Sequence, residues 1–426
     1  MKITYFGNAM ILLESKQTRL LCDPWVTFDR HSTSGLFNFP ELNLTKRDVA
    51  ALRPDYIYIS HTHEDHFDPI TLLLFALNTP ILVADFENNF TERHVKALGF
   101  TDVRVVDGDK GAPLNGSDWC WIEPNGTYPD VDSLIITRLD EFTIANLNDN
   151  PFEPDQVKRL ARRFSPIDLA CVPFSFQGPY PAFYENLSPA ERAAESMKKR
   201  QRNYDVMTQF AQTLQPQRLF PFAAGALYGG LRAKLFPFYG VGTASEAVEW
   251  ALKSTQFKPL LLSAHGSCDL RTDTQTGIYK ELSYEDHIEY IDDISTKRSI
   301  FDQGGAFWIA ESERIDLTKL LQRARLKQQD WQERRGHTTA RHVYFIDTGQ
   351  PKLYRLCLAD TTVTRVAEDA ITDEDYEIFR VPYPLLVGVL TGHYNWSNIK
   401  TQYISFFRKP NAFKPDLHIL MSFLQL

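Results

Sequence analysis

Short runs of apolar and β-branched residues, separated by glycine, proline and polar residues, dominate the first part of the chain and predict strands. In several of these runs the apolar residues alternate with polar ones, which is typical of a strand with one buried face. The first three runs are joined by short bends and predict a meander. The strands are expected at 3–6, 10–14, 20–25, 56–60, 134–137 and 142–146.

Longer segments carry apolar residues three and four positions apart and predict helices at 154–164 and 188–214. The character of the chain changes near residue 295, where a charged helix at 316–334 is followed by a hairpin. We therefore expect an α+β protein with a larger first domain and a smaller C-terminal α/β domain. The expected domains are residues 1–294 and 295–426.

Four side chains of metal-ligand type lie within six residues, directly after the predicted strand at 56–60. They belong to the sequence His61-Thr62-His63-Glu64-Asp65-His66. Imidazole and carboxylate groups bind a metal well when a tight loop fixes them toward one point. Asp68 and Pro69 follow, and they predict a helix that begins with Asp68 as its N-cap. We interpret the loop as a metal site, because a cation offsets the cost of burying such a cluster.

Composition narrows the class of protein without naming a function. The 426 residues are 43% hydrophobic and 23% charged, which is ordinary for a soluble globular protein. The net charge of -8 argues against a nucleic-acid-binding surface, since phosphate recognition needs a basic excess. Five scattered cysteines without a C-x-x-C pair argue against a disulfide framework and fit a cytoplasmic protein. We expect no signal peptide and no membrane-spanning helix.

The H-x-H-x-D-H sequence at 61–66 resembles the motif of the metallo-β-lactamase-fold superfamily. This resemblance implies a four-layer αββα sandwich with a metal site at one edge of its two sheets. It also implies a dinuclear site whose ligands come from several strand ends. The implied ligands are His61 and His63 for the first cation, Asp65, His66 and His265 for the second, and Asp149 between the two.

The same resemblance implies that Asp23, in the sequence Asp23-Pro24-Trp25, orients one of the metal ligands. The alternative is that Asp23 only forms a turn before Pro24. Asp149 and His265 have alternatives as well. Asp149 could belong to a simple turn, and His265 could be a buried, hydrogen-bonded histidine.

The sequence departs from the superfamily pattern at the third histidine of the first metal. No histidine lies between His94 and His265, and Tyr128-Pro129-Asp130-Val131-Asp132 stands where the family has its histidine turn. Either Tyr128 or a nearby carboxylate substitutes, or the first site is weak or empty. A phenolate ligand suits ferric iron better than zinc, so the substitution bears on the identity of the metal. Alternatively, Tyr128 only packs or forms a hydrogen bond.

Most of residues 1 to about 290 are also similar to the metallo-β-lactamase-like part of the CMP-N-acetylneuraminate hydroxylases. The similarity includes Asp23-Pro24-Trp25, the strand before His61, and the helix at 188–214. The Rieske domain of those hydroxylases has no counterpart in this chain. The order of elements after residue 295 is similar to sterol-carrier-like domains.

These features favour a metal-dependent hydrolase that acts on an ester, amide or phosphodiester, with Asp65 and Asp149 as the catalytic carboxylates. The expected cofactor is one or two divalent cations, with zinc first and iron or manganese as alternatives. A non-haem di-iron oxygenase with an external electron donor is the second interpretation. An inactive metal- or lipid-binding protein is the third. We expect a small-molecule substrate that could be anionic, no nucleic-acid partner, and a homodimer as one option for assembly.

Overall fold

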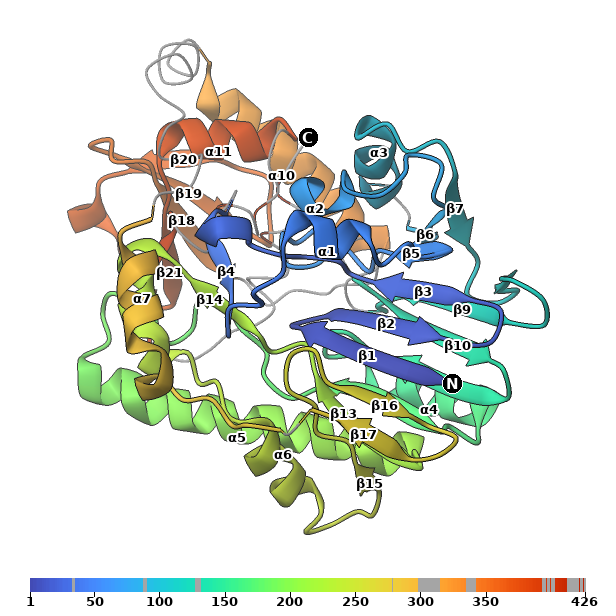
Figure 1. The fold of residues 1–426 in the computed structure, drawn as a ribbon. Coiled ribbons are helices and arrows are strands. Elements are labelled where there is room, and N and C mark those ends of the chain that lie inside the picture. Colours follow the sequence, from blue (N-terminus) through green and yellow to red (C-terminus); the bar gives the residue numbers. More distant parts are fainter. Residues whose placement is uncertain are drawn as a thin grey trace.

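The computed structural model describes residues 1–32, 35–86, 90–126, 132–277, 279–297, 315–334, 342–392, 396, 399, 403–411, 421 and 424. Two large sheets stack on each other (Figure 1). The first has eight strands, in the spatial order β17-β16-β1-β2-β3-β5-β6-β7. These strands are β1 (Lys2–Gly7), β2 (Met10–Glu14), β3 (Arg19–Cys22), β5 (Tyr56–Tyr58), β6 (Ile81–Ala84), β7 (Val103–Val106), β16 (Ser267–Asp269) and β17 (Thr274–Thr276).

The second sheet has seven strands, in the order β15-β13-β12-β11-β10-β9-β8. These strands are β8 (Ala112–Pro113), β9 (Trp119–Pro124), β10 (Ser133–Leu139), β11 (Phe142–Asn146), β12 (Leu169–Pro173), β13 (Arg218–Phe222) and β15 (Lys258–Pro259). β4 (Leu36–Asn38) and β14 (Ala226–Tyr228) form a separate two-stranded ribbon. The predicted N-terminal meander is confirmed, because β1, β2 and β3 pair in sequence.

Six of the described helices cover the outer faces of the two large sheets. The helices are α1 (Lys46–Ala50), α2 (Pro69–Leu72), α3 (Phe90–Ala97), α4 (Pro154–Phe164), α5 (Pro189–Leu214), α6 (Ala244–Ala251), α7 (Ile288–Ser295), α10 (Leu317–Arg334) and α11 (Tyr383–Leu390). The 3-10 turns are η1 (Phe28–Arg30), η2 (Gly230–Phe238), η3 (Glu285–His287) and η4 (Glu368–Ala370). α1, α2 and α3 lie on the first sheet, and α4, α5 and α6 lie on the second (Figure 1).

The strand pattern produces the layers. In β2, Ile11 and Leu13 point into the core between the sheets, whereas Met10 and Leu12 point into the core under α1 to α3. β12 is buried along its whole length, as expected for a parallel strand covered on both sides. The αββα sandwich implied by the sequence is therefore confirmed.

α5 shows how local sequence sets the element limits. Ser188 and Glu191 form a capping box at its start, with Pro189 in the first turn. The helix ends at Gln215, which adopts a left-handed conformation with φ of 45°. The predicted helix at 188–214 is confirmed at both ends.

A third sheet forms the C-terminal part, in the order β20-β19-β18-β21-β22. Its strands are β18 (Val343–Asp347), β19 (Leu353–Cys357), β20 (Thr364–Val366), β21 (Tyr376–Arg380) and β22 (Ser405–Lys409). The predicted hairpin is β18 and β19. The division at residue 294 and the likeness to sterol-carrier domains stay predictions.

The C-terminal sheet joins the sandwich through backbone and core. Tyr184, in the segment between β12 and α5, forms a parallel bridge with Phe406 of β22. Glu185 N donates to Phe406 O at 2.8 Å, and Phe406 N donates to Phe183 O at 3.1 Å. One hydrophobic core includes Trp25 and Tyr228 from the sandwich side together with residues of β18, β21 and β22.

Two further sequence expectations have outcomes in the structure. All five cysteines are buried and unpaired, as expected for a protein without a disulfide framework. Among the described residues, no helix combines the length and the apolar character that crossing a membrane requires.

Candidate metal centre

Parallel strands bring the motif to one edge of the sandwich. β3 and β5 are parallel, so Asp23 at the end of one strand lies beside the loop 61–66 that follows the other. Asp68 caps α2 by accepting from Ile70 N at 3.2 Å and Thr71 N at 3.0 Å, as predicted. His66 N and Phe67 N both donate to His63 O, which closes the loop as a turn. The motif is therefore held at its strand end and at its helix end.

The second sheet contributes Asp149, which follows β11. Asn148 orients Asp149, because the left-handed backbone of Asn148 (φ 55°) turns the chain directly after the strand. Its side-chain amide donates to Ser133 O at 2.7 Å. Ser133 begins β10 and donates from its hydroxyl to Ser60 O at 2.7 Å. This chain of contacts links the two sheets at the site.

Two groups of ligand atoms converge there. The first contains His61, His63 and Asp149, and the second contains Asp65, His66 and Asp149. Within each group the ligand atoms lie within 4.8 Å of one another. Ligands on opposite sides of one zinc-sized cation are about 4 Å apart. Each group thus has nearly the dimensions of a cation site, and Asp149 belongs to both.

Unpartnered atoms in the centre fit a bound cation. Nε2 of His61, Nε2 of His66 and Oδ1 of Asp149 are buried and have no hydrogen-bond partner among the described residues. Oδ1 of Asp149 lies 3.5 Å from Nε2 of His66 and 4.0 Å from Nε2 of His61. Buried polar atoms are normally paired or bound to a metal. These three atoms therefore fit the ligand role.

Carboxylates lie behind two of the imidazoles. Oδ2 of Asp23 is 2.9 Å from Nδ1 of His66, and Oδ1 of Asp132 is 2.9 Å from Nδ1 of His61. The Asp23 contact is a hydrogen bond, which fixes the tautomer of His66 and leaves Nε2 for the metal. Oδ1 of Asp132 has no hydrogen-bond partner among the described residues, and Nδ1 of His61 forms its hydrogen bond with Oγ of Ser60 at 2.9 Å. The contact of Asp23 is the one that its expected orienting role requires.

The buried imidazoles and carboxylates of the centre shift one another's pKa values in different directions. Burial, together with the like-charged His66, lowers the pKa of His61 to about 4. Burial opposes a charged His66, but the carboxylates of Asp149, Asp65 and Asp23 outweigh it and raise the pKa of that imidazole well above its usual range. Burial, with the neighbouring Asp149, raises the pKa of Asp132 to about 6. A cation would relieve this crowding of carboxylates.

Asn8 and Asp132 are site residues that the sequence reasoning missed or left unspecified. Asn8 donates from Nδ2 to Oδ2 of Asp65 at 3.1 Å and accepts from Gly225 N at 3.0 Å. Its φ of 47° places it in the tight bend between β1 and β2. The signal for Asn8 was the Gly7-Asn8 bend, and the signal for Asp132 was its acidic segment in place of the third histidine.

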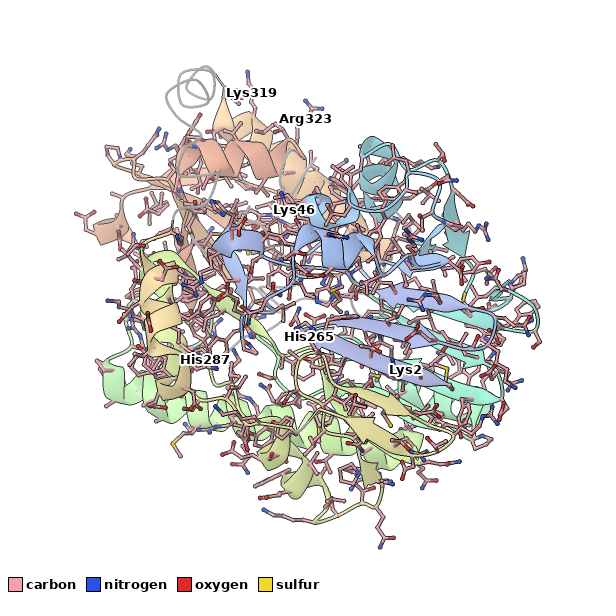
Figure 2. The ribbon with its side chains drawn as sticks, viewed as in Figure 1. Lys2, Lys46, His265, His287, Lys319 and Arg323 are labelled. Carbon is pink, nitrogen blue, oxygen red and sulfur yellow. The ribbon has the colours of Figure 1, made fainter. Side chains whose placement is uncertain are left out.

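The structure does not bring His265 into either ligand group, so nothing in the arrangement of the described residues supports its expected role as a ligand. Nε2 of His265 lies 2.6 Å from the carbonyl oxygen of Leu42, and the residue belongs to neither ligand group. In Figure 2, His265 lies near the ends of β1 and β2. The reason is that 260–264 is not a strand: only β15, at Lys258–Pro259, joins the second sheet there.

The strand that does reach this edge is β13. It runs parallel to β12, which in turn runs parallel to β11, so its end lies on the same side as Asp149. The residues that follow are Ala223, Ala224 and Gly225, none of which is a metal ligand. The other open assignment, Tyr128, lies outside the described residues.

Comparison with known proteins gives a family and several relatives. A family model described as "Beta-lactamase superfamily domain" matches residues 2–147. A UPF0173 metal-dependent hydrolase from Exiguobacterium sp. is 32% identical over 184 residues, which cover 41% of this chain and 73% of that protein.

Two relatives carry redox descriptions. A Mycolicibacterium smegmatis protein described as a Rieske 2Fe-2S iron-sulfur protein is 30% identical over 229 residues, covering 49% of this chain and 41% of that protein. The cytidine monophosphate-N-acetylneuraminic acid hydroxylase of Mus musculus is 29% identical over 153 residues, covering 35% of this chain and 26% of that protein. The chain thus spans less than half the length of both redox relatives.

Proposed function

We propose, since this chain belongs to the metallo-β-lactamase-fold superfamily, that it is a metal-dependent hydrolase of an ester, amide or phosphodiester-type substrate. The observation that carries the proposal is the convergence of Nε2 of His61, Nε2 of His66 and Oδ1 of Asp149, all buried and without hydrogen-bond partners among the described residues. A divalent cation bound there would act as a Lewis acid and lower the pKa of a water molecule.

The residues would divide the work as follows. His61, His63 and Asp149 would hold one cation, and Asp65, His66 and Asp149 would hold the other. Asp23 would keep the imidazole of His66 in the tautomer that exposes Nε2, and Ser60, whose Oγ lies 2.9 Å from Nδ1 of His61, would position the other imidazole.

Asp65 and Asp149 are the proposed catalytic carboxylates. Asn8 fixes one oxygen of Asp65, so this carboxylate has a defined direction for orienting water. Asp149 is shared by both ligand groups and would set their separation. Zinc is the proposed cation, because imidazole and carboxylate ligands suit it, although the same ligand types also bind iron and manganese. A small molecule is the proposed substrate, in keeping with the net charge of -8.

A di-iron oxygenase is the second candidate. It is favoured by the Rieske and hydroxylase descriptions of two relatives. The carboxylates in the ligand set are also compatible with non-haem iron. This function would require an external electron donor, because the described residues contain no cysteine cluster for an iron-sulfur centre.

Elemental analysis of protein prepared with and without oxygen tests both candidates. Hydrolysis predicts about two zinc ions per chain and turnover of generic esters, amides or phosphodiesters that proceeds without oxygen. Two irons, with a product that forms only in the presence of oxygen and a reductant, would overturn the hydrolase and support the oxygenase. Protein that binds no transition metal at micromolar concentration would overturn both.

A further inference from the structure

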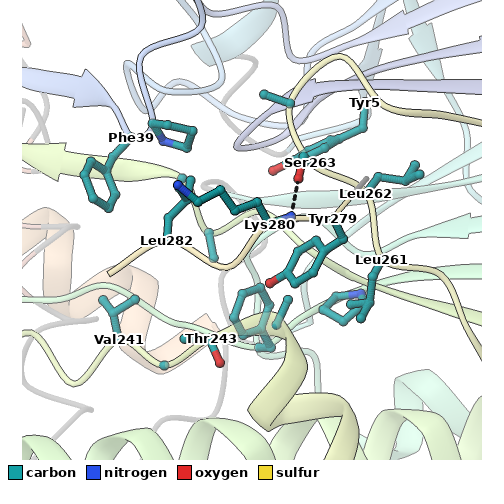
Figure 3. A pocket seen from close by; sticks show the side chains of 18 of the residues that line it. Tyr5, Phe39, Val241, Thr243, Leu261, Leu262, Ser263, Tyr279, Lys280 and Leu282 are labelled. Atoms are coloured by element: carbon teal, nitrogen blue, oxygen red, sulfur yellow. Dashed lines mark hydrogen bonds between the residues drawn. The ribbon is translucent and has the colours of Figure 1, made fainter. Parts of the chain in front are cut away.

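A second cavity lies beside the metal centre and is separate from it. It has a volume of about 300 Å³, and none of the proposed metal ligands lines it. Aromatic side chains form much of its wall, as Figure 3 shows in part. The aromatic lining consists of Tyr5, Phe39, Phe174, Phe220, Phe236 and Tyr279. This volume and lining are those of a small-molecule site.

The cavity and the metal centre share a wall. Gly225, which lines the cavity, donates its N–H to Oδ1 of Asn8 at 3.0 Å. Nδ2 of Asn8 donates to Oδ2 of Asp65 at 3.1 Å. A Cβ at Gly225 would lie 2.9 Å from Asn8 N, so the close approach of the two segments requires glycine here. A single side chain therefore separates the cavity wall from a proposed metal ligand.

Two polar groups distinguish the cavity from an ordinary gap in the core. Lys280 is exposed and forms no salt bridge with a described acidic residue, although its charge is among the causes that lower the pKa of the nearby Asp286. The nearby Asp286 is engaged by Ser283, from its N–H at 3.0 Å and its hydroxyl at 3.2 Å. Lys280 N donates to Ser263 Oγ at 2.8 Å, and in Figure 3 the side chain extends from there toward Leu282.

Gln177 supplies the second group. Its Nε2 donates to Ala226 O at 2.9 Å, which fixes the amide against the ribbon strand β14. Its Oε1 is buried and has no hydrogen-bond partner among the described residues. A buried acceptor of this kind is stabilised by a donor from a ligand or from water.

We propose that this cavity binds a small carboxylic acid with an aromatic body. The ring would lie among the aromatic side chains, the carboxylate would face Lys280, and a hydroxyl on the ring would donate to Gln177. The acid is either a separate ligand or one part of a substrate whose other part reaches the metal centre. The binding claim goes beyond the proposed function and does not depend on it.

Isothermal titration of the full chain with 4-hydroxyphenylacetate, phenylacetate and their uncharged amides tests the proposal. We expect saturable binding of at least one acid at one site. Lys280→Met should weaken binding of the acid about three- to tenfold and leave the amide unchanged, because the ion pair is exposed at the rim. Lys319→Met is the matched control, since Lys319 lies on α10 and is exposed, and it should change neither.

A second variant tests the cavity itself, in case Lys280 contributes little to the binding free energy of the acid. Val241→Trp fills the cavity and should abolish binding of acids and amides alike in protein that unfolds at an unchanged temperature. Failure of all four compounds to bind at millimolar concentration would overturn the proposal. So would binding that neither variant alters.

Kinetics then distinguish the two sources of the ligand. Competitive inhibition of hydrolysis by the acid would mark the cavity as part of the substrate site. Non-competitive inhibition, or no inhibition by the acid, would indicate that the cavity is a separate ligand site. Absence of any hydrolysis would count against the proposed function alone, since the titrations measure the cavity directly.

Discussion

Oδ1 of Asp149 lies 3.5 Å from Nε2 of His66, although the two residues follow strands of different sheets. β5 leads to His66 in the first sheet, and β11 leads to Asp149 in the second. The proposed centre therefore exists only when the two sheets are stacked. Binding of a cation and stability of the sandwich should be coupled for this reason.

Replacing Asp149 should remove the ligand common to both groups. We expect Asp149→Ala to lose at least one cation per chain, measured by elemental analysis after gel filtration. Asp155→Asn is the control, because that carboxylate is 94% exposed at the start of α4 and should leave the metal content unchanged. Full stoichiometry in Asp149→Ala would contradict the bridging role.

The metal content of two histidine variants tests whether His66 or His265 is a ligand. His66→Ala should lower the metal content, whereas His265→Ala should leave it at the wild-type value. His265→Ala should cost about 1 kcal/mol in the free energy of unfolding, because it removes one hydrogen bond to Leu42 O. Loss of metal from His265→Ala would support His265 as a ligand, as the sequence predicted.

The carboxylates behind the imidazoles should tune affinity without changing stoichiometry. We expect Asp23→Asn and Asp132→Asn each to weaken binding of the cation about 10- to 100-fold, measured by competition with a chromogenic chelator. Asparagine keeps the shape of the side chain and also tolerates the φ of 44° at Asp23. Affinity equal to wild type in both variants would show that these contacts do not act on the ligands.

Removing the cation should destabilise the protein. Without it, Asp65 and Asp132 are buried beside the carboxylate of Asp149, and burial together with that charge raises the pKa of both. A free cation at 100 times its Kd stabilises the folded state by about 2.7 kcal/mol, so the melting temperature should fall with a chelator and recover with added zinc. The variant Asp149→Ala should show a much smaller recovery. An equal response in both proteins would place the effect elsewhere.

The C-terminal sheet should depend on a buried ion pair. Nη2 of Arg408 donates to Oε2 of Glu377 at 2.7 Å, and the hydroxyl of Tyr184 donates to the other carboxylate oxygen. Glu377→Gln removes the negative charge and should destabilise the fold by about 3–5 kcal/mol in a urea titration.

The double variant Glu377→Leu with Arg408→Met is the control for this prediction. It removes both charges and should be nearer to wild type than Glu377→Gln, because no unpaired charge stays buried. A single variant as stable as wild type would show that the pair is screened by water.

Sequence alone predicted the parts of the proposed site that lie in one short segment. The loop 61–66 carries four ligand-type side chains, and Asp68 and Pro69 fix the helix that follows. Spacing along a strand, a tight turn and a helix cap is set by local geometry, so these positions could be inferred without the fold. Asp149 was also within reach, because it follows a strand that the alternation predicts.

Tertiary structure decided which distant residues meet. His265 looked like the end of a strand, but its segment leaves the second sheet after β15 and turns toward Leu42. Asn8 and Asp132 carry no motif. Asn8 reaches Asp65 because the β1–β2 bend and the loop after β5 lie at the same edge of the first sheet, and Asp132 reaches His61 because the two sheets stack. Such contacts depend on how strands from different parts of the chain align, and that alignment arises from the packing of the whole core rather than from any local run of residues.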